Sequence, residues 1–230
     1  MPRLAGRFEI AGAALFDGVE LALRPGEWTC LLGPSGCGKS TILRLFAGLE
    51  TGGRFAGTLD AAVGEAAYMA QSDMLAPWLD VTANVTLGAR LRGEAPDMAR
   101  ARDLIARVGL SGHEGKRPAE LSGGMRQRAA LARTLMEDRP VALLDEPFSA
   151  LDAATRATCQ ELAFELLSGR TVLLVTHDPA EAARLGHEVH VMGQGGVVHS
   201  QRPAGRPIRD PASPDTLSAQ TSLLAEVRAA

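Results

Sequence analysis

Aromatic residues are scarce in this sequence of 230 residues, at 4% of the total, and positive charge is not in excess. So few aromatic rings argue against a stacking platform for single-stranded nucleic acid. The net charge of −3 at pH 7 gives the chain no general attraction to nucleic acid or to anionic lipid. We therefore do not expect nucleic acid as a partner.

Long apolar runs and paired cysteines are also lacking. No run approaches the roughly 18–20 apolar residues that a transmembrane helix needs, and residues 1–10 lack the charged-then-apolar layout of a signal peptide. The three cysteines, Cys30, Cys37 and Cys159, are odd in number and unclustered, which predicts free thiols in a reducing compartment. We expect a cytoplasmic protein, unless a partner holds it at a membrane.

The most informative segment present is glycine-rich. This segment, 33–41, matches G-x-x-x-x-G-K-[ST]. An apolar run at 28–32, which predicts a strand, precedes it, and a helix-like stretch at 41–49 follows it. In such a loop the backbone N–H groups and the helix N-terminus bind phosphate oxygens, Lys39 reaches the β- and γ-phosphates, and Ser40 binds Mg²⁺. We call it the phosphate loop, and its residues are Gly33, Pro34, Ser35, Gly36, Cys37, Gly38, Lys39, Ser40 and Thr41.

The remaining pattern alternates strands with helices, which predicts an α/β sheet. Strands are expected within 8–32 and 54–70 and at 141–144 and 171–175, and helices within 81–136, at 154–167 and directly after Asp178. The tail 201–230 contains four prolines up to position 214, so we expect it to be extended, with a possible short helix at 217–227.

Two further motifs carry chemistry. The run 141–144 ends in Asp145 and Glu146, where an aspartate can hold Mg²⁺ through water and a glutamate can act as the general base toward the attacking water. Ser122, Gly123 and Gly124 form a second anion-binding element, because Ser122 can cap a helix that runs toward position 136 and leave the glycine amides at its start.

Taken in order, these motifs resemble those of the ATP-binding subunit of ABC transporters, over nearly the whole chain. Leu121 to Gly124 match the family's signature, Gln71 its glutamine loop, Ser149 to Asp152 its D-loop, and His177 its switch histidine. The resemblance implies a P-loop NTPase fold in one domain, with a RecA-like core, an N-terminal antiparallel β part and an inserted helical subdomain at about 78–137.

The resemblance also implies roles and partners. Glu146, His177 and Gln71 are expected at the catalytic centre, and Ser40, Gln71 and Asp145 at the metal ion. ATP would lie between the phosphate loop of one subunit and the signature and Asp152 of a second ATPase subunit, either a second copy or a paralogue. Other implied partners are a membrane permease, with the chain on the inner face of the membrane, and through it an extracytoplasmic substrate-binding protein.

A finer resemblance is to importers of nitrate, sulfonates and taurine, carried by Pro77-Trp78 through Asn84-Val85 and by the Arg-Pro pairs at 202–203 and 206–207. Importers of thiamine-pyrimidine precursors look similar, and a soluble ABC ATPase of assembly or repair is the alternative from another class. A small-molecule kinase would have no use for the signature.

Two positions depart from the family pattern. The signature continues with Met125, where glutamine is common, and the segment 10–14 lacks the aromatic residue that usually stacks on adenine. Phe8 and Phe16 are the nearest aromatic residues, and we expect both in the core.

Overall fold

The structure is a computed structural model that describes residues 1–230, apart from the side chains of Val197 and Val198. Its strands are β1 (Arg3–Ile10), β2 (Ala13–Ala22), β3 (Trp28–Leu32), β4 (Arg54–Asp60), β5 (Ala66–Met69), β6 (Val141–Asp145), β7 (Thr171–Thr176), β8 (Glu188–Gly193) and β9 (Gly196–Gln201). Its helices are α1 (Lys39–Phe46), α2 (Val81–Val85), α3 (Leu87–Leu91), α4 (Met98–Arg107), the 3-10 helix η1 (Pro118–Glu120), α5 (Gly123–Met136), α6 (Ala153–Leu166), α7 (Pro179–Leu185) and α8 (Pro214–Ala229).

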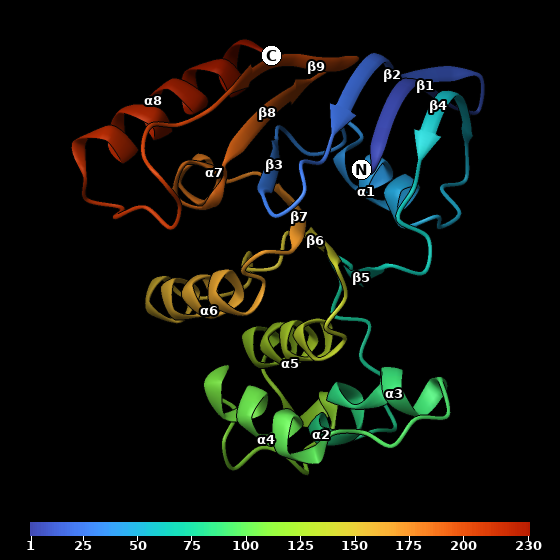
Figure 1. Cartoon of the computed structure of the whole chain (residues 1–230), viewed down its shortest axis with the longest axis vertical. Helices are drawn as coiled ribbons and strands as arrows, with labels where there is room; N and C mark the ends of the chain where they lie inside the picture. The colour runs from blue at the N-terminus through green and yellow to red at the C-terminus, as the bar shows by residue number, and fades with distance from the viewer.

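The strands form two sheets. The larger has the order β5-β6-β7-β3-β8-β9, parallel except for β9 at its edge, and the smaller is an antiparallel sheet of order β2-β1-β4. Helices α2 to α5 extend the molecule beyond the β5 edge of the larger sheet (Figure 1). The expected α/β fold, with an N-terminal antiparallel part and an inserted helical part, is confirmed.

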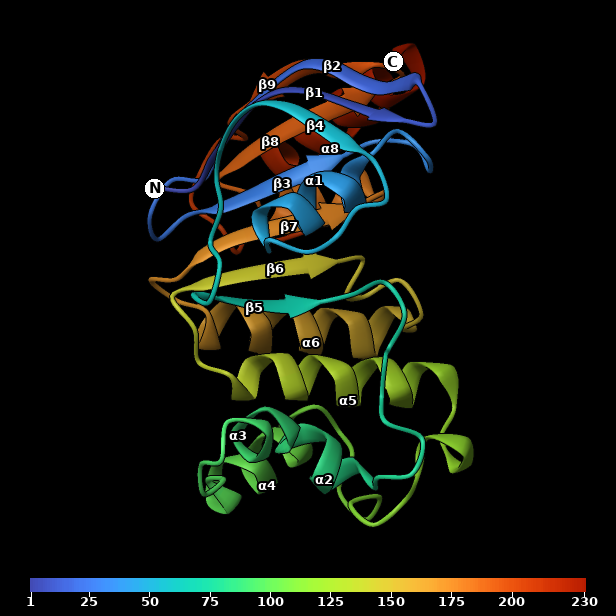
Figure 2. The same cartoon turned by 90° about the vertical axis from the view of Figure 1, so that its right-hand side faces the viewer.

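The larger sheet separates two hydrophobic cores, because successive side chains of a strand point to opposite faces. In β3, Trp28, Cys30 and Leu32 face one core, together with α5, α6 and α7, whereas Leu31 faces the other, together with α1 and the smaller sheet. Helix α1 lies between the two sheets (Figure 2). Trp28 is 1% exposed and packs against Phe164 of α6, with ring centroids 5.2 Å apart.

The parallel arrangement decides where functional residues gather. The carboxyl ends of β3, β6 and β7 lie at one edge of the sheet (Figure 2), so the segments that follow these strands meet there. They are the phosphate loop, Glu146 and His177. Ligands of open parallel sheets bind at this edge for the same reason.

The C-terminal segment differs from the expectation. Helix α8 has 16 residues, whereas a short helix at 217–227 was expected in an extended tail. The prolines caused this error: Pro214 occupies the first turn of the helix, where the missing N–H costs no hydrogen bond, and the Ser213 side chain caps the helix by accepting from the N–H of Thr216. Leu223 of α8 is fully buried.

A buried arginine anchors the segment before α8. Arg209 is 7% exposed, and its guanidinium donates hydrogen bonds to the backbone carbonyls of residues 183, 186, 203, 204 and 205. The first two carbonyls belong to the end of α7, so one side chain ties the tail to the helix that follows His177.

No helix among the described residues is long and apolar enough to cross a membrane. The three cysteines are free thiols, as the sequence predicts, and all three are buried.

Candidate active site

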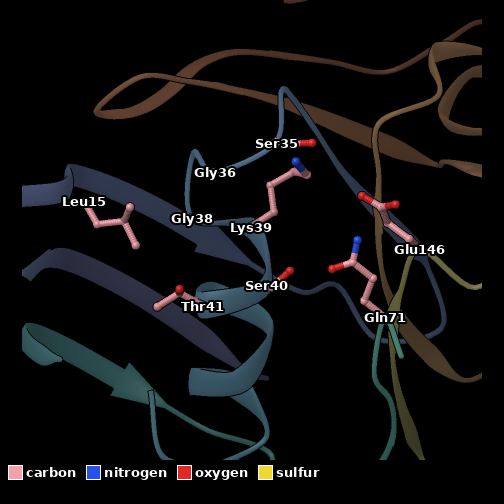
Figure 3. A pocket seen from close by; sticks show the side chains of 9 residues that line it. All are labelled: Leu15, Ser35, Gly36, Gly38, Lys39, Ser40, Thr41, Gln71 and Glu146. Atoms are coloured by element: carbon pink, nitrogen blue, oxygen red, sulfur yellow. The ribbon is translucent and has the colours of Figure 1, made fainter. Parts of the chain in front are cut away.

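A cavity of about 180 Å³ lies at the carboxyl edge of the parallel strands. Segments far apart in the sequence converge on it (Figure 3), because the side chains of Lys39, Gln71 and Glu146 lie around the same space. Its other lining residues are Leu15, Ser35, Gly36, Gly38, Ser40 and Thr41. Of the expected phosphate-loop residues, Gly33, Pro34 and Cys37 do not line the cavity.

The conformation of the phosphate loop depends on glycine. Gly38 has φ 106°, in the region that L side chains rarely adopt, and it is the N-cap of α1. Gly33 has no room for a side chain, because a Cβ atom there would collide with the carbonyl oxygen of Met192. The first residues of α1 line the cavity, so the N-terminus of the helix, whose first N–H groups have no partner within the helix, lies against it.

Lys39 is 5% exposed, and its ammonium group lies within its own loop. Its Nζ donates to the carbonyl oxygens of Gly33 at 2.8 Å and Pro34 at 2.7 Å. The positive charge is thus held at the mouth of the loop, where phosphate oxygens would enter.

Asp145 has the surroundings of a metal-binding carboxylate. It is 3% exposed, and its Oδ1 atom has no hydrogen-bond partner, which is costly for a buried charged oxygen. Burial raises the pKa of its carboxyl group, and the neighbouring Ser40 hydroxyl opposes the rise. A hydroxyl oxygen and an unsatisfied carboxylate oxygen are ligands that suit the hard cation Mg²⁺. Ser40 and Asp145 therefore fit a magnesium site.

An unusual backbone conformation directs the side chain of Glu146 at the cavity, and a backbone hydrogen bond holds the residue in place. Its φ is 47°, which strains a residue that has a Cβ atom. Its N–H donates to the carbonyl oxygen of Val175 at 2.9 Å. Its carboxylate Oε2 lies 3.0 Å from Nδ1 of His177, a side chain that is 55% exposed. The structure thus brings these two expected catalytic side chains into contact.

Gln71 follows β5 and is exposed at the cavity. The segment after it is fastened to α5, because Arg126 pairs with the carboxylate of Asp73 at 3.0 Å and Arg133 donates to the carbonyl oxygens of Asp73 and Met74 at 2.8 Å. Further along, the side chain of Asn84 is fully buried and bonds to the backbone of residues 76, 79 and 80. This shows what Asn84 of the Pro-Trp motif does: it shapes the loop that carries Trp78.

The second anion-binding element lies outside the cavity. Ser122 accepts from the N–H of Met125 at 3.3 Å and so caps α5 as predicted, yet Ser122 and Gly123 are exposed and no signature residue lines the cavity. Asp152 is also exposed and caps α6 by accepting from the N–H of Thr155 at 3.0 Å. Within one chain the structure does not bring these residues to the phosphate loop.

Neither candidate for adenine stacking faces the cavity. Phe8 and Phe16 are fully buried and stack on each other at 5.7 Å between ring centroids, so their expected core role is confirmed. Sequence reasoning missed Leu15, which lines the cavity beside Gly38. Its place in the alternation of β2, next to the buried Phe16, is the signal that would have indicated it.

Known proteins resemble this chain along most of its length. The family model described as ABC transporter matches residues 16–149. An ABC transporter ATP-binding protein of Haemophilus influenzae is 49% identical over 79% of this chain and 77% of its own length. The aliphatic sulfonates import ATP-binding protein SsuB 1 of Pseudomonas syringae pv. syringae is 46% identical over 87% of this chain and 86% of its own length. A solved dimeric structure of the ATP-binding cassette MJ0796, in a post-hydrolysis state bound to ADP and Pi, superimposes with a TM-score of 0.76 at 27% identity, covering 90% of this chain and all of that one.

Proposed function

This chain belongs to the ABC transporter family, and we propose that it is the ATP-hydrolysing subunit of an importer of the type that takes up nitrate, sulfonates or taurine. The observation that carries the proposal is the convergence of the phosphate loop, Gln71 and Glu146 on one cavity. The relatives named for aliphatic sulfonate import support the substrate class. Substrate choice itself belongs to the permease and the binding protein.

In the proposed reaction the ATP phosphates bind the N–H groups of the phosphate loop, and Lys39 contacts the β- and γ-phosphates. Ser40, Gln71 and Asp145 would hold Mg²⁺, directly or through water, and the metal ion supplies charge neutralisation on the phosphate oxygens. Glu146 accepts a proton from the attacking water. His177, already 3.0 Å from that carboxylate, orients it and reaches the γ-phosphate.

The exposed signature supports a dimeric active unit. An uncovered helix N-terminus with two glycine amides leaves donors free for an anion brought by another molecule. We propose that two subunits pack head to tail, so that Ser122, Gly123, Gly124 and Asp152 of each cover the ATP bound by the other. The dimeric arrangement of the cassette MJ0796 supports this. A homodimer is the simplest form.

An exposed apolar group on the helical part supports docking to a permease at the inner face of the membrane. Met74 is 65% exposed, Trp78 72% and Leu91 78%, and all three belong to the segment between β5 and α4. Large exposed apolar side chains close together in the sequence are the residues we expect in such an interaction surface. An extracytoplasmic binding protein would deliver the substrate to that permease.

Gentle detergent extraction of tagged protein from its native membranes tests the transport function. We expect a polytopic permease and an extracytoplasmic binding protein to co-purify, and the binding protein to prefer sulfonates over pyrimidines in a ligand screen. A pyrimidine preference would replace the substrate class. Recovery with soluble partners alone would favour an assembly or repair ATPase and refute import.

A further inference from the structure

The side chain of Gln127 connects the signature helix to the segment that carries Glu146. Gln127 lies in the second turn of α5 and is 6% exposed. Its Nε2 donates to the carbonyl oxygen of Glu146 at 2.9 Å and to Oγ of Ser149 at 3.2 Å, and its Oε1 accepts from the N–H of Ala150 at 2.7 Å. A backbone N–H can only donate and a carbonyl can only accept, so these partners fix the orientation of the amide.

The hydrogen bonds of Gln127 and Ser149 form a small network around the carbonyl group of Glu146. The hydroxyl of Ser149 also donates to the carbonyl oxygen of Glu146, at 3.1 Å, while it accepts from Gln127. The N–H of Glu146 is bound on its other side to Val175 of β7. The peptide groups on both sides of the Glu146 Cα atom are therefore fixed, one by the sheet and one by α5.

This fixation matters because of the backbone conformation of Glu146. A φ of 47° is unfavourable for a residue with a Cβ atom, and such a conformation persists only where the surroundings impose it. If φ relaxed to the ordinary negative range, the Cα–Cβ bond would turn and the carboxylate would leave its place beside Nδ1 of His177. The buried amide of Gln127 opposes that relaxation.

We propose that Gln127 is a positioning residue for ATP hydrolysis, which holds the Glu146 backbone in its left-handed conformation so that the carboxylate faces the cavity. The inference rests on the proposed role of Glu146 as general base. It also gives the signature helix a direct mechanical connection to the hydrolytic carboxylate of the same chain, since Gln127 lies one turn from Gly123 and Gly124.

The test is a set of steady-state ATP hydrolysis measurements on the full chain with Gln127→Met, which keeps the side-chain volume and removes all three hydrogen bonds. The matched control is Gln160→Met, because Gln160 is also a helical glutamine, 4% exposed, and bonds to Arg184 away from the cavity. We expect Gln127→Met to lower kcat by about tenfold to hundredfold, the range for a slightly misplaced catalytic group, with KM for ATP changed by less than about twofold. Gln160→Met should lower the melting temperature comparably and leave kcat within about twofold of the parent.

A kcat for Gln127→Met as high as that of the control would overturn the proposal, and so would a rise in KM at unchanged kcat. If Gln127→Met does not fold, Ser149→Ala at the exposed end of the network serves instead, with an expected several-fold loss of kcat at unchanged KM. An active parent with an inactive Glu146→Gln variant supports the proposed function separately. A fully active Glu146→Gln variant would overturn the roles of Glu146 and Gln127 while ATP hydrolysis itself stands, whereas a parent without ATPase activity would overturn the proposed function.

Discussion

Replacing Glu181 by glutamine removes an ionisable group from beneath the loop that carries His177, and the effect on stability is expected to depend on pH. Glu181 lies on α7 and is 5% exposed. Burial raises the pKa of its carboxyl group from the ordinary 4.5 to about 7; the hydrogen bond from the Thr176 hydroxyl, 2.7 Å from Oε2, opposes the rise, and the charge of Asp178 adds to it. Arg156 and His177 favour the ionised form more weakly.

The sign of the effect follows from linkage between protonation and folding. Below about pH 4.5 the carboxyl group is protonated in both the folded and the unfolded chain, so its stabilising contribution is complete. As the pH rises towards 7 the unfolded chain ionises first, and the contribution is lost. One pKa unit corresponds to about 1.4 kcal/mol, so the interval from 4.5 to about 7 amounts to an upper limit of about 3 kcal/mol.

The assay is urea denaturation of the parent and of Glu181→Gln at several pH values between 5 and 8. The partly buried His187 and the buried His190, whose pKa values are lowered by burial, titrate in both proteins, so the difference between the two unfolding free energies isolates Glu181. We expect the variant to gain up to about 3 kcal/mol relative to the parent between pH 5 and pH 8. A difference that stays constant over this range would refute the reasoning, whatever its absolute size.

The remaining predictions concern the site and the tail. Lys39→Ala is expected to abolish binding of a fluorescent ATP analogue because the phosphate loop loses its only cation; unchanged ATPase activity would contradict this. Glu146→Gln should bind ATP and stall as a stable dimer in size-exclusion chromatography, whereas turnover at the parental rate would remove the residue from the role of base. Arg209→Met should lower the unfolding free energy by at least about 3 kcal/mol, since it strands several buried carbonyls, while Met at the exposed Arg206 should have little effect. Leu15→Tyr should strengthen binding of ATP about fivefold or more, the equivalent of about 1 kcal/mol of base stacking; equal gains for ATP and for inorganic triphosphate would show that stacking is not the cause.

Short-range chemistry made much of the fold predictable from the sequence. The phosphate loop between an apolar strand and a helix, the Ser122 cap of α5 and the Asp178 cap of α7 all depend on neighbouring residues, and the structure contains each of them. The buried parallel strands were equally predictable from the sequence, because strands with both faces covered appear as continuous apolar runs, here at 141–144 and 171–175.

What escaped prediction depends on contacts between segments distant in the chain. The three hydrogen bonds of Gln127 reach partners about twenty residues away in the sequence, and no local pattern around Gln127 predicts them. Leu15 lines the cavity only because β2 packs beside α1. Helix α8 is longer than expected for a local reason: the prolines of the tail predict an extended chain, yet Pro214 stands at the start of a helix, where proline is favoured.

The two tryptophans of the chain differ strongly in solvent exposure, so their fluorescence reports on two different parts of the molecule. Trp28, 1% exposed against Phe164, should emit at short wavelength, resist quenching by iodide and change only when the core melts. Trp78, 72% exposed on the helical part, should emit at long wavelength and be quenched readily. The quenchable fraction of the fluorescence can therefore follow the docking of a partner on the helical part without any label, while the unquenched fraction shows that the fold is intact.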